Sequence, residues 1–368
     1  MTSGAVILLT GVLCAVACAL LGTFLILRKM AMMTDAISHA ILPGLVFGYW
    51  VANGNNVVLG ALGATLAALV TISLVEALQN SGRVQGGEAM GIVFPAMFAL
   101  GTVLVTRFFS DVHLDTDSIL YGNIEFSSFD RFVLGGRDLG PQSLWIMGTL
   151  VVINVLFLAL FYKELKLSTF DAGLAATLGF APALVHYLLM TVLSITTVGA
   201  FTAVGAILVV ALVIVPAATA YLLTERLVEM IAYSAMIGAL SAVTGYWLAI
   251  WIDGSVSGAI VTMSGVFFFL ALLFSPLEGL VARMRRNELN RQRFALDMLL
   301  MHLSTHERTA TESTESSIGH ISAALHWPPD ETTKTVQRAI DRDLVVRYGP
   351  NVILTSRGRE KVKTLLDR

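Results

Sequence analysis

The sequence predicts an all-α polytopic membrane protein with about nine transmembrane helices, followed by a small cytoplasmic winged helix-turn-helix domain. Of its 368 residues, 56% are apolar and 14% charged, whereas soluble domains are about half apolar and a quarter charged. The apolar residues gather in runs of about 20, the length at which a helix crosses a bilayer. Residues 283–368 differ, because they hold 15 of the 24 Lys and Arg. We therefore expect a transmembrane domain over 1–282 and a different kind of domain behind it.

Nine apolar runs define the predicted spans. They cover roughly residues 5–27, 35–52, 57–78, 89–107, 142–162, 182–200, 202–222, 228–251 and 256–276. Basic residues mark every second connection, at Arg28, Lys29, Arg83, Lys163, Lys166, Arg226, Arg283, Arg285 and Arg286. Connections rich in Lys and Arg stay in the cytoplasm. We therefore expect a multi-pass protein of the bacterial inner membrane, with its N-terminus outside and its C-terminus in the cytoplasm.

The second predicted span contains two ionisable residues, Asp35 and His39. Their spacing of four places them on one helix face, and a rise of about 1.5 Å per residue from Lys29 places His39 about 15 Å into the bilayer. Ionisable groups at that depth are costly and usually functional. A carboxylate with an imidazole suits manganese, iron or zinc, although a structural Asp–His hydrogen bond is the alternative. Pro43 and Gly44 follow a turn later, where they can break the helix and free backbone carbonyls.

A polar segment, residues 164–181, lies between the fifth and sixth predicted spans. Ser168 or Thr169 is expected to cap a short helix over Asp171–Leu178, which Gly179 ends. A short amphipathic helix on the cytoplasmic side of a transporter is suited to docking a motor subunit, and a plain surface helix is the alternative.

The connection before the fifth span is acidic. It carries Asp111, His113, Asp115 and Asp117 within seven residues. Such a cluster forms a possible outer mouth that concentrates cations, or else a solvated loop.

The tail has the element order of a winged helix-turn-helix domain. We expect a helix over 277–305, a polar linker over 306–317, helices over 318–326 and 330–342, short strands over 344–347 and 352–355, and a helix over 356–367. The domain divisions are thus 1–282, 283–317 for the helix and linker, and 318–368. His302 and His306, with Glu307, have a spacing that suits metal binding, and a solvated helix face is the alternative.

Six motifs in order resemble the ABC-type zinc, manganese and iron permeases and cover nearly the whole membrane region. They are Asp35-Ala-Ile-Ser-His-Ala-Ile-Leu-Pro-Gly44, Glu88-Ala-Met-Gly-Ile-Val-Phe94, Ile119-Leu-Tyr-Gly-Asn-Ile124, Asp171-Ala-Gly-Leu-Ala-Ala-Thr-Leu-Gly179, Val213-Ile-Val-Pro-Ala-Ala-Thr-Ala220 and Leu272-Leu-Phe-Ser-Pro276. The tail resembles regulators of the diphtheria-toxin-repressor kind, through Asp343-Leu-Val-Val-Arg347 and Leu354-Thr-Ser-Arg-Gly358.

The resemblance implies an importer that moves divalent metal into the cytoplasm. It implies a dimeric permease core, homodimer or heterodimer, with cytoplasmic ATP-binding subunits and an extracytoplasmic metal-binding protein. Asp35 and His39 match the family's metal pair, and Asp171–Gly179 matches its coupling helix, in which Phe170, Leu174 and Leu178 form an apolar stripe. The transported metal, manganese, zinc or iron, is then the bound species, and no permanent cofactor is expected.

The sequence contains no G-x-x-x-x-G-K-[ST] motif, so a phosphate-binding loop of that kind is absent. We therefore expect a permease rather than an enzyme, with ATP hydrolysed on a partner chain. Two alternatives are an ion-coupled secondary metal transporter and a membrane-anchored metal-responsive regulator. For the tail, a regulatory or protein–protein role is favoured over binding of nucleic acid.

Overall fold

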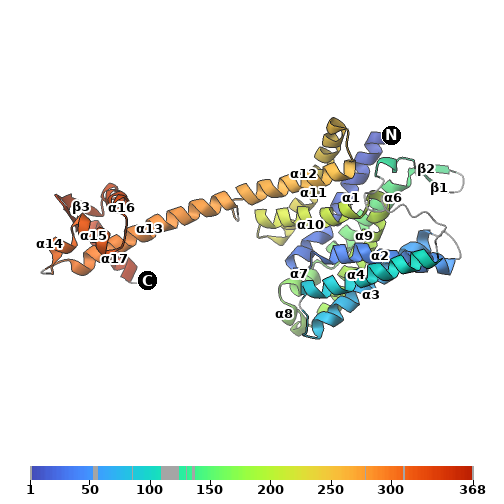
Figure 1. Cartoon of the computed structure of the whole chain (residues 1–368), viewed down its shortest axis with the longest axis horizontal. Coiled ribbons are helices and arrows are strands. Elements are labelled where there is room, and N and C mark those ends of the chain that lie inside the picture. Colours follow the sequence, from blue (N-terminus) through green and yellow to red (C-terminus); the bar gives the residue numbers. More distant parts are fainter. Residues whose placement is uncertain are drawn as a thin grey trace. The chain divides into compact units, whose positions relative to one another are not determined.

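The computed structural model describes residues 2–52, 57–84, 86–108, 124–129, 131–134, 137–277, 279–309 and 311–366. It contains two compact units, Met1–Gly279 and Leu280–Arg368. Figure 1 labels the elements of both.

The first unit is a helical bundle. Its helices are α1 (Ser3–Leu27), α2 (Met33–Ala52), α3 (Val57–Asn80), α4 (Gly86–Phe108), α6 (Gln142–Leu160), α7 (Tyr162–Phe170), α8 (Ala172–Thr177), α9 (Pro182–Val204), α10 (Ala206–Leu223), α11 (Leu227–Ile252) and α12 (Val256–Phe274). A 3₁₀ turn (Ile124–Phe126) and an antiparallel hairpin, β1 (Arg131–Leu134) and β2 (Arg137–Pro141), precede α6.

Eight helices of the described residues are long and apolar enough to cross a membrane: α1, α3, α4, α6, α9, α10, α11 and α12. The predicted span 35–52 is helical as α2 but is not among the eight, because Asp35, Ser38, His39 and Pro43 lower its mean hydropathy. The prediction of a helical polytopic membrane protein is confirmed, with eight such helices where nine were predicted.

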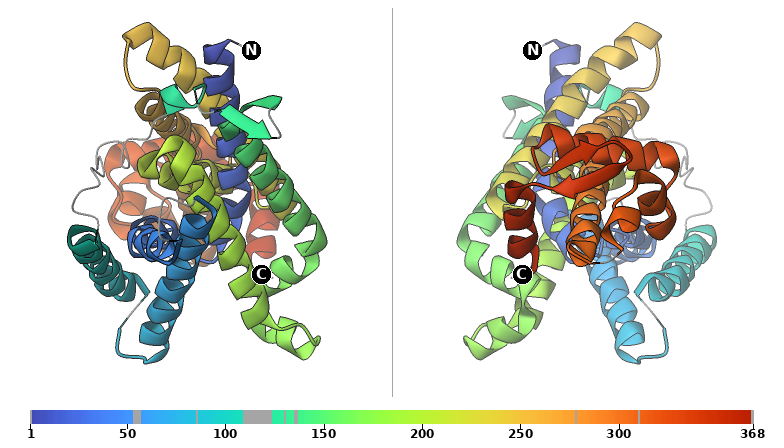
Figure 2. Two further views of the ribbon diagram at one scale, coloured as in Figure 1. Left: turned by 90° about the vertical axis from the view of Figure 1, so that its right-hand side faces the viewer. Right: turned by 90° about the vertical axis from the view of Figure 1, so that its left-hand side faces the viewer.

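Helix α1 lies inside the bundle, packed against α6, α9, α10 and α11 (Figure 2). Polar side chains of its neighbours reach its backbone: Asn154 Nδ2 donates to the carbonyl of Ala17, and Ser234 Oγ donates to that of Ala19, both at 3.0 Å. Buried hydrogen bonds of this kind hold membrane helices together where the hydrophobic effect does not.

Helices α2 and α3 approach closely through glycines. A Cβ atom on Gly44 would lie 2.6 Å from the Cα of Ala64, and one on Gly48 would overlap the carbonyl of Leu59. Small residues permit such close backbone contact. Helix α2 is continuous through Pro43, so the helix break considered from the sequence does not occur.

The second unit has its own apolar core, which includes Leu299, Leu300, Ile321, Val336 and Val352. Its elements are α13 (Leu280–His306), α14 (Glu312–Glu315), α15 (Ile318–Ala324), α16 (Pro329–Asp341), β3 (Val345–Tyr348), β4 (Asn351–Leu354) and α17 (Ser356–Leu366). Strands β3 and β4 pair antiparallel, with Val345 opposite Leu354.

Replacing Gly44 by alanine should destabilise the protein, because the added methyl group meets α3 at less than contact distance. Overpacking of this kind costs about 1–3 kcal/mol. Gly91→Ala is the matched control, since no atom lies within 4 Å of a Cβ there. Thermal unfolding in detergent should show a lower Tm for Gly44→Ala only. Equal Tm values for the two variants would contradict the close packing of α2 and α3.

Candidate functional site

Helix α2 presents Asp35 and His39 on one face, as their spacing predicts. The His39 Nε2 atom lies 3.6 Å from Asp35 Oδ1, which is longer than a normal hydrogen bond. The side chains are 28% and 39% exposed, so neither is sealed in the core. This geometry disfavours the alternative of a structural Asp–His hydrogen bond and leaves ligand atoms of both residues accessible.

The imidazole of His39 is held by aromatic neighbours on α4. Its ring centroid lies 4.5 Å from that of Phe94 and 5.6 Å from that of Phe98, the second in an edge-on arrangement. Contacts of this geometry are favourable. They restrict the orientation of the ring without occupying its nitrogen atoms.

A cavity of about 350 Å³ borders the pair. One wall is α2, which contributes Asp35, Ser38 and His39. The other wall is an apolar face of α10, formed by Ala206, Ile207, Val210, Ala211, Ile214 and Val215. The hydroxyl of Ser38 donates to the carbonyl of Thr34 at 2.9 Å. Asp35 and His39 therefore supply the charged and basic groups of this cavity.

Pro43 leaves one backbone oxygen of α2 without its helical donor. Proline has no N–H group and cannot donate to the residue four positions earlier. In the uninterrupted helix α2 that residue is His39. The carbonyl of His39 therefore lacks its usual donor within the helix, close to its own imidazole.

The predicted coupling helix is present as α8, but its cap differs from the prediction. The carboxylate of Asp171 accepts a hydrogen bond from the N–H of Leu174 at 2.8 Å, so Asp171 is the N-cap. Ser168 and Thr169 instead belong to α7. Gly179 has φ +87°, the left-handed conformation expected of a helix-ending glycine. Phe170, Leu174 and Leu178 are 62%, 47% and 58% exposed.

Arg28, at the end of α1, is bound by three residues. Its guanidinium donates to Ser168 Oγ at 2.8 Å and to Thr169 Oγ1 at 3.0 Å, and contacts His186 Nδ1 at 3.2 Å. Burial lowers the pKa of Arg28 from its ordinary value. Ser168 and Thr169 thus join α7 to the end of α1, which explains why neither caps α8.

The same contacts continue to α3 through His186. Arginine can only donate, so His186 Nδ1 accepts from Arg28 and the neutral ring carries its proton on Nε2. That atom contacts Glu76 Oε1, and the hydroxyl of Tyr187 donates to Glu76 Oε2 at 2.6 Å. No local pattern reveals their connection, because the partners are far apart in the chain.

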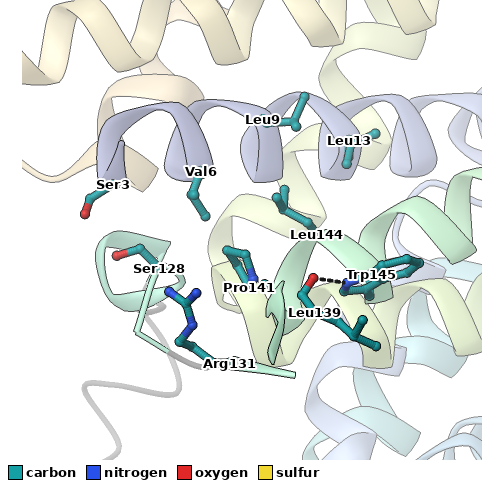
Figure 3. Close-up of a pocket in the computed structure, with 11 residues that line it drawn as sticks. Ser3, Val6, Leu9, Leu13, Ser128, Arg131, Leu139, Pro141, Leu144 and Trp145 are labelled. Carbon is teal, nitrogen blue, oxygen red and sulfur yellow. Dashed lines mark hydrogen bonds between the residues drawn. The ribbon is translucent and has the colours of Figure 1, made fainter. Parts of the chain in front are cut away.

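The predicted outer cation mouth, Asp111, His113, Asp115 and Asp117, lies outside the described residues. A hollow of about 520 Å³ lies between the start of α1, the β1–β2 hairpin and the start of α6. Figure 3 shows Arg131 among its lining residues. This arginine pairs with Asp138, whose pKa is lowered by the Gly140 N–H and by Arg131. The described lining contains no carboxylate, so the hollow is a poor cation site.

Glu307 does not join His302 and His306 as the sequence suggested. Its carboxylate binds Arg359 Nε at 2.7 Å. Glu315 instead lies beside the two histidines, with its Oε2 3.9 Å from each Nε2 atom.

A family model described as the ABC 3 transport family matches residues 5–275. The chain belongs to this family. It is 41% identical to the zinc transport system membrane protein TroD of Treponema pallidum, over 98% of each chain. It is 44% identical to the manganese transport system membrane protein MntD of Bacillus subtilis, over 78% of this chain and 97% of that one.

A solved structure, PsaBC from Streptococcus pneumoniae in complex with Fab, has the same fold. The TM-score is 0.63 at 29% identity, covering 76% of this chain and 94% of that chain. The chain is therefore a membrane permease subunit of an ABC metal importer, and ATP is hydrolysed on a separate subunit. Family membership favours this function over an ion-coupled secondary transporter.

Replacing Arg28 by lysine should loosen α7 in this permease. Lysine keeps the charge but not the planar fork that reaches three partners, and hydrogen bonds to a charged group contribute about 1.5–3 kcal/mol each. We expect trypsin to cleave at Lys163 and Lys166 on the order of tenfold faster or more, measured by mass spectrometry. Arg226→Lys, at an exposed pair with Glu229, is the control. Unchanged cleavage would show that Arg28 does not anchor this segment.

Proposed function

We propose that Asp35 and His39 form the site through which a divalent zinc, manganese or iron ion crosses the membrane. The proposal is carried by one observation: the two side chains share a cavity without hydrogen-bonding to each other. An ion in that cavity gains a carboxylate oxygen and an imidazole nitrogen, the ligand types that these metals accept. The carbonyl of His39, freed by Pro43, is a third ligand on the same turn.

The metal enters from outside, passes this pair and leaves into the cytoplasm as the permease dimer alternates its access. The basic connections support this orientation, with the N-terminus outside and the C-terminus inside. The acidic segment containing Asp111, His113, Asp115 and Asp117 then forms the outer mouth. An extracytoplasmic metal-binding protein supplies the ion, and a second permease half, identical or related, completes the pathway. The metal is cargo, and no permanent cofactor is required.

The coupling element is α8 with its flanking residues. Phe170, Leu174 and Leu178 are exposed apolar residues, with Leu174 and Leu178 four positions apart, and such a stripe suits a groove on another protein. Asp171 and Gly179 define the two ends of the helix. We assign this stripe to contact with a cytoplasmic ATP-binding subunit.

Movement of the coupling element reaches the bundle through Arg28. Its bonds to Ser168 and Thr169 tie α7 to α1, and its contact with His186 continues to Glu76 on α3. Helix α3 in turn packs on α2 through glycines. This connection gives a physical route from the ATPase contact to the helix that carries the metal pair.

For the C-terminal residues 318–368 we propose a winged-helix domain with a regulatory role. Two helices, α15 and α16, are followed by the β3–β4 hairpin and by α17, the order that the sequence predicted. The preceding residues 283–317 then serve as its helix and linker, with Leu299 and Leu300 of this helix packed in the core of the same unit. Residues 1–282 serve as the transmembrane domain. Nucleic acid is not required as a partner.

Asp35→Asn and His39→Gln should each reduce metal uptake by about tenfold or more in vesicles containing the ATPase. Each change removes a ligand of the ion while keeping a similar side-chain volume. Radioactive manganese or zinc uptake measures the effect, and size-exclusion chromatography verifies folding. His326→Asn in the second unit is the control and should transport normally. Normal uptake by either pair variant would remove that residue from the pathway.

Leu174→Asp should uncouple the ATPase from transport. It places a charge in the proposed apolar contact, where an unpaired charge is costly, without altering the cavity beside Asp35. We expect uptake to be lost and ATP hydrolysis to stop responding to metal-loaded binding protein.

Leu366→Asp, also at an exposed leucine, is the control for the added charge. If the Leu174→Asp protein assembles with its ATPase and transports normally, α8 is not the coupling element.

A further inference from the structure

The second unit brings three histidines around one carboxylate. The Glu315 Oε2 atom lies 3.9 Å from His302 Nε2, 3.9 Å from His306 Nε2 and 3.2 Å from His320 Nδ1. The ligand atoms of His302, His306 and Glu315 all lie within 4.8 Å of one another. Three groups that bind metals through nitrogen or oxygen therefore lie within one small volume, and His320 lies beside their carboxylate.

Three separate elements supply these groups. His302 and His306 are one turn apart at the end of α13, so their rings lie together, with centroids 4.9 Å apart. Glu315 ends α14, and His320 lies in the first turn of α15. Ser317 caps α15 by accepting from the His320 N–H, which fixes the backbone between Glu315 and His320.

The spacing suits a tetrahedral metal ion. Zinc binds histidine nitrogen and carboxylate oxygen at about 2.0–2.2 Å, so neighbouring ligand atoms lie about 3.4 Å apart. The observed separations from Glu315, 3.2–3.9 Å, bracket that value. To bind one ion, the ligand atoms of His302, His306 and Glu315, now within 4.8 Å of one another, must draw closer, and His320 must move with them. The Nε2 atom of His302 must also leave the backbone carbonyl of Glu315, which lies 3.2 Å away.

The cluster is partly enclosed rather than a solvated helix face. The side chain of His302 is 10% exposed and that of Glu315 is 20% exposed. Leu299, Leu300 and Leu303 of the apolar core lie on α13 beside the two histidines. A carboxylate held at this depth needs compensation by cations or by hydrogen bonds.

Among the described residues, the carboxylate of Glu315 forms ion pairs with histidines alone. Its described ion pairs are with His302, His306 and His320, and none is with an arginine or a lysine. Glu307, the acidic residue nearest His306 in the sequence, forms an ion pair with Arg359. The fold thus selects Glu315 as the carboxylate of the cluster.

We propose that His302, His306, His320 and Glu315 form a second metal site, which binds a zinc-type divalent ion as a resident ligand. Three imidazoles and one carboxylate are a donor set that zinc prefers. The ion ties the end of α13 to α14 and α15 across residues 307–311. Its occupancy therefore controls the packing of the second unit, independently of the pair Asp35 and His39.

The test uses the full chain in detergent micelles, with Asp35→Asn and His39→Gln introduced together to remove the transport pair. Cobalt(II) is the probe, because tetrahedral cobalt absorbs visible light. We expect one equivalent of cobalt to bind with such a band. His306→Gln and Glu315→Gln should each weaken this binding by about tenfold or more. His326→Asn, at a histidine outside the cluster, should leave it unchanged.

A second measurement needs no substitution in the cluster. Diethyl pyrocarbonate modifies accessible histidines, and zinc should protect His302, His306 and His320 but not His326, as measured by mass spectrometry. Absence of a tetrahedral cobalt band, equal cobalt affinity in the cluster variants, or equal modification with and without zinc would each overturn the proposal. Circular dichroism identifies any cluster variant that fails to fold. In that case the zinc protection experiment, which needs no cluster substitution, decides whether the site exists.

Discussion

A carboxylate and an imidazole inside an apolar bundle impose the constraint on which the rest of the membrane unit depends. Ionisable groups are expensive at that depth, so the surrounding helices must both hold them and leave them available. The α2–α3 contact through Gly44 and Gly48 fixes the helix that carries them. Phe94 orients the His39 ring from α4, and an apolar face of α10 forms the opposite wall. Among the described residues these neighbours contact the pair without hydrogen-bonding to it, which leaves its ligand atoms available to the proposed metal ion.

The charged groups near the end of α1 differ from this pair, because they bind one another. Arg28, His186 and Glu76 contact one another in series, and the hydroxyls of Ser168 and Tyr187 complete the set. A neutral imidazole between a cation and an anion contacts both, which lowers the cost of burying them. Satisfied groups of this kind act as structural connections, and here they join α7 to α1, α9 and α3. The bundle therefore contains one set of ionisable residues that bind one another and one pair, Asp35 and His39, that do not hydrogen-bond to each other.

Local patterns in the sequence were sufficient for most elements and for the placement of Asp35 and His39 together on α2. Apolar runs give the long helices, and the spacing of Asp35 and His39 gives their common face, because both properties depend on neighbours within a few residues. Contacts between segments far apart in the chain could not be predicted from local patterns. Ser168 appeared to be a cap because the arginine that binds it is 140 residues away. Glu307 appeared to complete the histidine pair, but the fold assigns it to Arg359 and brings Glu315 instead. Such choices are made by tertiary packing, which spacing alone does not encode.

The two proposed metal sites differ in their number of ligands, as their proposed roles require. A site on a transport pathway must release its ion in every cycle, so few ligands and an open cavity are an advantage. Asp35 and His39 supply two side chains beside a space of about 350 Å³. A resident ion needs a closed set of ligands, and the cluster around Glu315 supplies four groups from three elements. Similarity to the Bacillus protein covers 78% of this chain, whereas similarity to the treponemal protein covers 98%. The proposed transport pair lies within residues 5–275, which match the family model, whereas the proposed resident site lies outside them.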